Sequence, residues 1–199
     1  GVNAGNSIES GGNYNVVVGD EAGTAITTGD FNVFVGYASG DGTTTSSNNT
    51  GVGYDSLTAN TTGANNVAVG ALSLDANTTG DQNVALGTSA LGALTAGDKN
   101  VAVGNSALAA FNVTDGSETF NTAVGYAAGG AVTTGIQNTI IGGLAGDALT
   151  DADKNVAVGY LALSSEDVGS NATAVGYAAL ANENSATATD TYNTAVGAL

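Results

Sequence analysis

Hydrophobic and polar positions alternate in a short string, Asn-Val-Ala-Val-Gly, that returns along the chain, as at 66–70, 100–104 and 155–159. An alternation with a period of two is typical of a short β-strand, in which Val67 and Val69 share one face and Ala68 takes the other. Frequent glycines and β-branched residues oppose a helix. The pattern therefore predicts one such strand in every repeat.

The glycine that ends each string, here called the anchor glycine, recurs at a fixed distance. The spacing of successive anchors along the chain is 17, except for two steps of 21. The anchors are Gly19, Gly36, Gly53, Gly70, Gly87, Gly104, Gly125, Gly142, Gly159, Gly176 and Gly197. A Thr-Thr-Gly string, as at 78–80, marks a second turn in many units. Strand, glycine turn, short strand and Thr-Thr-Gly turn, repeated at fixed length, describe one coil of a β-solenoid.

We therefore predict an all-β fold, a parallel β-roll of about eleven 17-residue coils with two coils expanded to 21 residues. Residues 1–199 are expected to form a single repeat domain with a partial coil at each end, a fragment of a longer fibrous protein. The residue four after the anchor is either Leu or Gly, and where it is Gly an apolar residue usually follows three positions later. This exchange predicts a narrow interior with one apolar plug per coil.

Stacking turns each recurring residue into a column. Asparagine stands four residues before the anchor in ten of the eleven units. Its amide is expected to satisfy turn backbone and to bond coil to coil, a structural role rather than a ligand role. This asparagine column is Asn15, Asn32, Asn49, Asn66, Asn83, Asn100, Asn121, Asn138, Asn155 and Asn193.

Alanine recurs in the middle of the strand. We expect it to face away from an interior lined by valine, because a solvated β-face would more naturally carry Thr, Lys or Glu. Small outward side chains let another backbone approach, so this column predicts a contact face between protomers of a homotrimer; a bland surface is the alternative. The alanine column is Ala68, Ala85, Ala102, Ala123, Ala157, Ala174 and Ala195.

Tyrosine follows the anchor directly in five units, which form the tyrosine column. An exposed row of rings could stack on sugars and recognise glycans. The competing interpretation is that each ring covers a coil corner or a seam between chains. The residues are Tyr37, Tyr54, Tyr126, Tyr160 and Tyr177.

Two further columns suggest ligand chemistry. Four carboxylates in register after the second turn could hold Ca²⁺, although a solvated acidic face is the more common meaning of such a row. The residues are Asp30, Asp81, Asp98 and Asp153. The paired threonines of the second turn suggest an ice-binding array, but adjacent residues point to opposite sides, which favours turn chemistry.

Composition excludes several classes of function. The chain has no His and no Cys, which removes imidazole bases, thiolate nucleophiles and zinc fingers, so we expect no enzyme and no cofactor. A formal charge of -16, with Lys99 and Lys154 as the only cations, argues against nucleic acid as a partner. No apolar run is long enough for membrane insertion. The expanded coils, at 105–120 and 177–192, are candidate binding loops on a rigid scaffold.

The repeat resembles two families. The strings NVAVG and NTAVG (121–125 and 193–197) are similar to the S/N-V-A-I-G strand of YadA-like heads in trimeric autotransporter adhesins. The phrase NTAVGYAAGGAVTTGIQN looks like the NTA-V/I-G-Y-x-A-L-x-x-N-T-T-G repeats of bacteriophage tail-fibre proteins. The resemblance implies a left-handed roll, three chains around one axis, and an extracellular rod on a bacterial surface or phage virion that attaches to a host receptor or glycan. The unit is longer than the autotransporter repeat, and the choice between the two settings stays open.

The leading hypothesis is thus a structural and adhesive fibre segment. A glycan-binding module that uses the tyrosine column or the expanded coils is the first alternative, and an ice-binding solenoid is the second.

Overall fold

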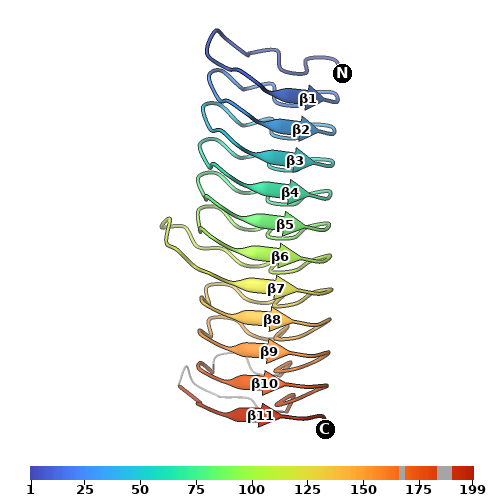
Figure 1. Cartoon of the computed structure of the whole chain (residues 1–199), viewed down its shortest axis with the longest axis vertical. Coiled ribbons are helices and arrows are strands. Elements are labelled where there is room, and N and C mark those ends of the chain that lie inside the picture. The colour runs from blue at the N-terminus through green and yellow to red at the C-terminus, as the bar shows by residue number, and fades with distance from the viewer. Residues whose placement is uncertain (166–168, 183–189) are drawn as a thin grey trace.

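In a computed structural model of the chain, every repeat contributes one three-residue strand to a single parallel sheet (Figure 1). The structure describes residues 1–165, 169–182 and 190–199. The strands follow one another in chain order across the sheet. They are β1 (Val16–Val18), β2 (Val33–Val35), β3 (Thr50–Val52), β4 (Val67–Val69), β5 (Val84–Leu86), β6 (Val101–Val103), β7 (Thr122–Val124), β8 (Thr139–Ile141), β9 (Val156–Val158), β10 (Thr173–Val175) and β11 (Thr194–Val196).

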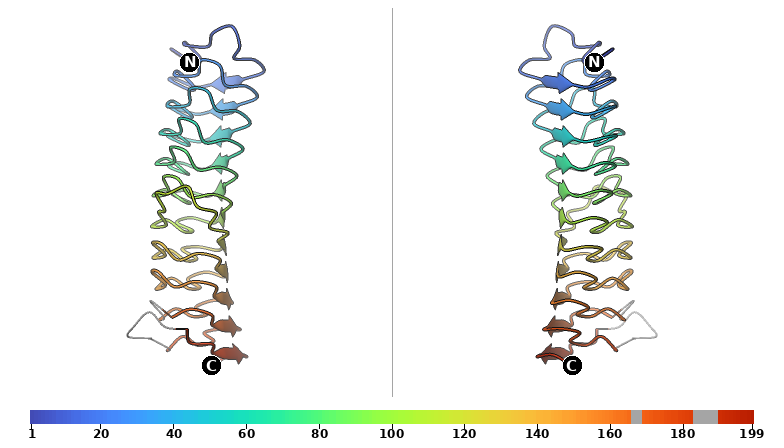
Figure 2. Two further views of the ribbon diagram at one scale, coloured as in Figure 1. Left: turned by 90° about the vertical axis from the view of Figure 1, so that its left-hand side faces the viewer. Right: turned by 90° about the vertical axis from the view of Figure 1, so that its right-hand side faces the viewer.

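The register of the sheet follows the sequence repeat. Val84 pairs with Val101, which is the ordinary step of the repeat, whereas Val101 pairs with Thr122, which is one of the two longer steps. The second longer step joins β10 to β11. The predicted parallel β-solenoid and its two expanded coils are therefore confirmed. Two side views show a nearly straight rod with the strands along one side and the returning segments along the other (Figure 2).

Each coil contains one strand rather than the predicted two. Between the anchor glycine and the second turn the chain runs through tight turns, with positive φ at Leu72 (56°) and Leu74 (49°). Alternate residues in the left-handed region cannot lie in an extended strand.

No helix among the described residues is long and apolar enough to cross a membrane.

The anchor glycines set how closely the coils approach. Gly70 has a φ of 138°, and a Cβ there would lie 2.6 Å from the carbonyl oxygen of Gly87, the anchor of the next coil. Both the backbone conformation and the contact exclude a larger side chain. The column of glycines in the sequence is thus a column of backbone contacts along the rod.

The alanine column lies inside the coil, so the prediction that it forms an oligomer face is wrong. Its members from β4 to β10 have no exposed area, and Ala195 is partly buried against the same core. The flanking strand residues point outward instead, and Val69 and Leu86 are 39% and 37% exposed. The physical reason is the width of the interior: strand and returning segment lie so close that most coils accommodate only a methyl group beside the plug.

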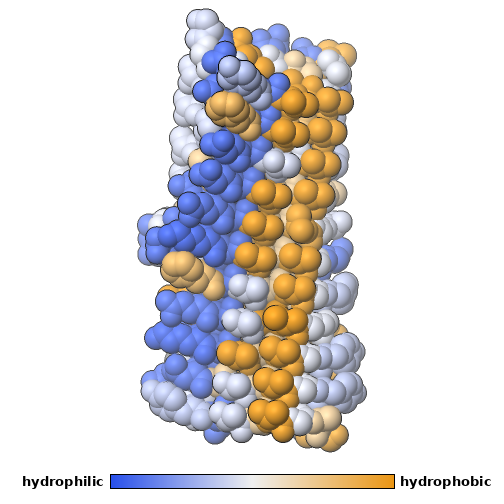
Figure 3. Space-filling view, in the orientation of Figure 1, coloured by the Kyte–Doolittle hydropathy of each residue, from blue (hydrophilic) through white to orange (hydrophobic). Residues whose placement is uncertain are grey.

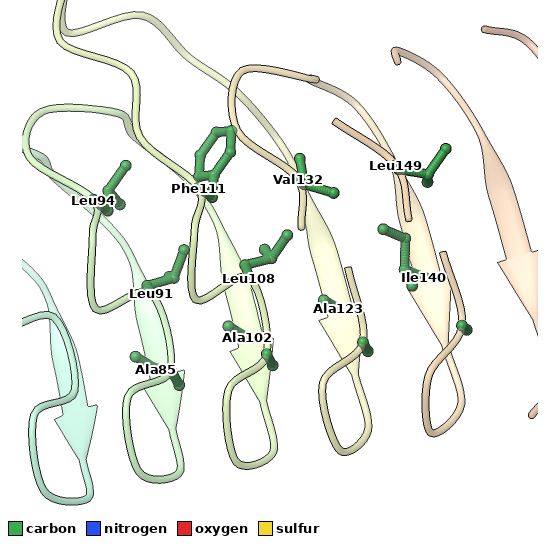
Figure 4. Close-up of a cluster of buried hydrophobic side chains, with 14 of the residues drawn as sticks. Ala85, Leu91, Leu94, Ala102, Leu108, Phe111, Ala123, Val132, Ile140 and Leu149 are labelled. Atoms are coloured by element: carbon green, nitrogen blue, oxygen red, sulfur yellow. The ribbon is translucent and has the colours of Figure 1, made fainter. Parts of the chain in front are cut away.

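Two coils hold two buried plugs each, which is one more than the repeat predicts, whereas the coil that follows them holds the predicted one. Leu91 and Leu94, and Leu108 and Phe111, fill two successive coils (Figure 4), and all four are fully buried. In the next coil Gly129 replaces the leucine and Val132 is the buried plug. The core is therefore one narrow, close-packed column of side chains along the rod.

Large residues in the alanine column are compensated by glycine. Phe34 is fully buried in β2, and a Cβ on Gly40 would lie 2.5 Å from its ring. A Cβ on Gly51 of β3 would come within 2.9 Å of the same ring. The volume of side chains inside each coil is thus nearly constant. It comes either from the strand or from the segment that returns from one strand to the next.

Candidate functional surfaces

The asparagine column forms the hydrogen-bond ladder that the repeat predicts. The Asn66 side-chain oxygen accepts the backbone N–H of Asn83 at 2.9 Å, and its amide donates to the Gly80 carbonyl at 2.8 Å. The same pair of bonds recurs around Asn121 and Asn138. These amides are buried from Asn32 to Asn155 and occupied by backbone, so the column acts in structure and not as a ligand surface.

The four aspartates that follow the second turn, here called the aspartate column, make a second ladder of hydrogen bonds between coils. The carboxylate of Asp98 accepts the backbone N–H of Asp81 at 2.7 Å, and Asp153 does the same for Ile136. Asp30 accepts the N–H of Asn13 and Asp81 that of Ala64. No group of three or more acidic residues that could hold a metal ion occurs in the described part of the chain. The geometry therefore assigns the four carboxylates to backbone capping rather than to Ca²⁺.

Burial shifts the pKa of several carboxyls upward. Desolvation raises the pKa of Asp98, although the N–H of Asp81 and the charge of Lys99 oppose the shift. Desolvation also raises the pKa of Asp75 and Asp147, and one oxygen of Asp147 is buried without a hydrogen-bond partner. Each of these groups is only partly buried, and the negative charges of Asp81 and Glu118 near Asp98, and of Asp55 near Asp75, also raise the pKa.

The second turn is held by threonine hydroxyls. Thr61 donates to the carbonyl of Thr78 in the next coil at 2.9 Å, and Thr78 donates to Thr95 at 3.0 Å. The second threonine of the pair, as at Thr62 and Thr79, is exposed. Since half of the hydroxyls are committed to coil contacts, turn chemistry accounts for the repeat of threonine.

The tyrosine column is exposed but pairs with itself. Tyr37 and Tyr54 stack with ring centroids 5.7 Å apart, and Tyr160 and Tyr177 stack at 5.9 Å. Stacking covers one face of each ring, and the hydroxyl of Tyr54 is hydrogen-bonded to the carboxylate of Asp55. Tyr126 is 64% exposed and has no ring partner among the described residues. A hydrogen bond to Glu21 raises the pKa of Tyr37, so its hydroxyl is neutral at physiological pH.

Another column lies five residues before each anchor and includes both lysines; we call it the lysine column. It also contains the aromatic pair Tyr14 and Phe31, which stack with ring centroids 4.9 Å apart. Lys99 pairs with Glu118 and lies 5.4 Å from the centroid of the Phe120 ring. The first expanded coil, 105–120, thus returns to the rod through the Lys99 contacts. Residues 183–189 of the second, 177–192, lie outside the described residues.

The surface that sequence reasoning missed is the outer strand face, formed by the first and third residues of β1 to β11. In Figure 3 its apolar columns run the length of the rod beside a hydrophilic column. Val16, Val18 and Ile141 are 50%, 54% and 40% exposed. The signal was present in the sequence, because none of these positions holds a charged residue.

Two depressions lie at the ends of the rod. One, of about 500 Å³, is lined by polar residues that include Asn3, Glu21 and Asp41. The other, of about 370 Å³, lies where the core opens beside β11 and is lined by Leu180, Val196 and their neighbours.

Comparison with known proteins gives no relative: no family model, no curated protein and no solved structure matches this chain.

Proposed function

We propose that this chain is a structural and adhesive fibre segment, the shaft or head of a homotrimeric rod that attaches to a host surface. The observation that supports it is the parallel sheet of eleven strands, in which the asparagine, aspartate and threonine columns bond one coil to the next. Such a molecule works through length and rigidity. The resemblance to autotransporter heads and phage tail fibres supports a left-handed coil and an extracellular setting, on a bacterial cell or a virion.

Absence of reactive side chains agrees with this proposal. The sequence has no His or Cys, and the carboxylates of the aspartate column accept backbone N–H groups. We therefore propose no enzymatic activity, no cofactor and no nucleic-acid partner.

Two measurements test the proposal. Light scattering of the purified chain at micromolar concentration should give three times the chain mass of 19.0 kDa, and a one-chain mass would contradict the trimer. Fluorescently labelled protein should bind saturably to intact bacterial or animal cells in a panel that includes both. Failure to bind any cell type, by a protein with the expected mass and β-structure, would contradict attachment.

Glycan recognition is a second candidate, supported by one observation. Tyr126 projects from the tyrosine column with a ring that no other ring covers among the described residues. Replacement of Tyr126, Tyr160 and Tyr177 by Ala should then abolish binding to a glycan array and leave the circular dichroism spectrum unchanged. A matched Tyr→Phe triple variant should retain stacking and most of the affinity. Equal glycan binding by the Ala variant would reject this candidate.

A further inference from the structure

The outer strand face is an unusual surface for a single soluble chain. It consists of two uncharged columns that run from β1 to β11, one apolar throughout and the other made of Val with Thr in five strands (Figure 3). The third strand residue is Val, Leu or Ile in every strand, and the first is Val or Thr. Soluble monomers rarely expose a continuous apolar surface larger than a few hundred Å². The face therefore has the character of a surface that another molecule covers.

Its dimensions suit a stable protein interface. At ~4.8 Å per coil the face is roughly 50 Å long, and with the columns on either side it is roughly 15–20 Å wide. The resulting area, about 750–1,000 Å², is close to the ~800 Å² that each partner contributes to a standard interface. The central columns are apolar, while the lysine column on one side and the tyrosine column on the other form a more polar rim, as in most interfaces.

Charge indicates which partner fits. The chain carries 18 acidic and two basic residues, yet none of them occupies the first or third position of a strand. A net charge of -16 makes copies of the chain repel one another everywhere else. The outer strand face is where two copies can approach without desolvating carboxylates.

The lysine column distinguishes parallel from antiparallel association. Lys99 comes just before β6, the middle strand of eleven. Full antiparallel overlap, face to face, would place each lysine column against itself, with Lys99 opposite Lys99 of the second copy. Parallel, in-register association instead places the lysine column against the tyrosine column of the neighbour. Phe120 then faces Tyr126, and Lys154 faces Tyr160, of the second copy, which are favourable aromatic and cation–π pairs.

We infer that copies of this chain associate through the outer strand face, side by side, parallel and in register. The inference rests on the proposed function, in which the rod is an assembly of copies, and it assigns the contact to the flanking valines rather than to the alanine column. The alanines are enclosed within each coil and are unavailable to a neighbour.

Cysteine cross-linking tests the arrangement directly, because the chain has no cysteine of its own. A mixture of Val33→Cys and Val35→Cys in β2 should give mixed dimers with a bismaleimide cross-linker that spans about 10 Å, the spacing of packed sheets. Parallel, in-register copies place the first residue of a strand opposite the third residue of the same strand in the neighbour. Ala110→Cys, exposed on the returning segment, is the matched control and should stay monomeric on a denaturing gel. An absence of dimers that join position 33 of one copy to position 35 of another would overturn the inference.

A mixture of two variants tests direction. Antiparallel overlap would pair β2 with β10, so Val35→Cys mixed with Val175→Cys would give mixed disulfides, detectable as linked peptides by mass spectrometry. Parallel association gives no such product, because positions 35 and 175 of two copies then lie eight coils apart. Peptides that join position 35 of one copy to position 175 of another, as the dominant product, would therefore overturn the inference.

Charged substitutions test the surface itself. Val101→Glu with Val103→Glu should reduce the mass in solution to 19.0 kDa and leave the circular dichroism spectrum unchanged, whereas Ala110→Glu should change neither. An unchanged assembly mass in the double Glu variant would overturn the inference. Cross-linked copies that bind no cell surface would contradict the proposed attachment alone, and a rod that binds cells as a single chain would contradict the present inference alone.

Discussion

The side-chain oxygen of Asn66 accepts the backbone N–H of Asn83, one coil further along the rod, at 2.9 Å. Both residues are fully buried, and Asn66 also donates its amide to the Gly80 carbonyl. One side chain therefore makes hydrogen bonds to two backbone groups that are buried in the narrow coil and cannot bond to water. Repeated along the rod, this relationship makes each coil depend on its neighbour.

Replacing Asn66 by Ala should destabilise the protein by about 2–4 kcal/mol, because each buried backbone group left without a partner costs about 1–3 kcal/mol. Asn66→Asp keeps the acceptor and loses the donor, so it should be unstable at neutral pH and recover partly in acid, where a protonated carboxyl can donate to Gly80. Urea unfolding followed by circular dichroism measures both. Asn105→Ala, at an exposed position, is the control and should change stability by less than about 0.5 kcal/mol.

Gly104 and Gly197 have nearly the same backbone conformation but different surroundings. Their φ angles are 134° and 137°; a Cβ on Gly104 would lie 2.3 Å from the Gly125 carbonyl oxygen, whereas a Cβ on Gly197 would meet nothing within 4 Å. Gly197→Ala should cost about 1–3 kcal/mol of local backbone strain. Gly104→Ala should cost more, because it also forces two coils apart. Equal losses in thermal unfolding temperature for the two variants would contradict a role for the anchor column in coil spacing.

The exchange of volume between strand and returning segment can be tested with Gly129 and Ile140. A Cβ on Gly129 would lie 2.9 Å from Ile140 Cδ1 and 3.0 Å from Leu108 Cδ2. Ile140→Ala should cost about 2–5 kcal/mol by opening a cavity, and Gly129→Leu about 1–3 kcal/mol by overpacking. The double variant restores the commoner pairing of a leucine with an alanine, so its loss should be at least about 1 kcal/mol smaller than the sum. Additive losses would show that the two sites do not share one space.

The repeat made most of this fold predictable. The anchor spacing predicted the eleven strands, the two expanded steps and the position of strands such as β6, because stacking in register places one strand at each repeat of the pattern. The asparagine ladder was also predictable, since a buried amide in register has few other roles. The period-two alternation, however, divides a strand into two faces without saying which is inside.

The width of the interior decides which face of the strand points inward, and one feature of the sequence indicates the answer. Phe34 and Ile140 interrupt the alanine column, and Gly40 and Gly146 stand in the same coils at the position that elsewhere holds leucine. Such compensation is needed only if the alanine column faces inward. The assignment of valine to the core was wrong because it ranked side chains by hydrophobicity and left out the width of the coil.

Acidification should stabilise this protein, and Asp98 supplies the test. Desolvation raises the pKa of Asp98 in the folded state above its unfolded value, as it does for Asp75 and Asp147. The folded state then binds more protons than the unfolded state, so stability rises as pH falls from 7 towards the ordinary Asp pKa of about 3.9, and it levels off below that value. Relief of repulsion within a chain of charge -16 has the same sign.

Asp98→Asn isolates this contribution, because an amide oxygen can still accept the N–H of Asp81, at 2.7 Å in the wild type, without a buried charge. The variant should be more stable than wild type at pH 7 and should gain less stability between pH 7 and pH 4. Asp115→Asn is the matched control of opposite sign, since hydrogen bonds from Ser117 lower the pKa of Asp115 and its charge is therefore stabilising. Differential scanning calorimetry across this range measures all three proteins. A wild-type melting temperature that falls steadily from pH 7 to pH 5 would show that charged aspartates stabilise the ladder more than their desolvation opposes it.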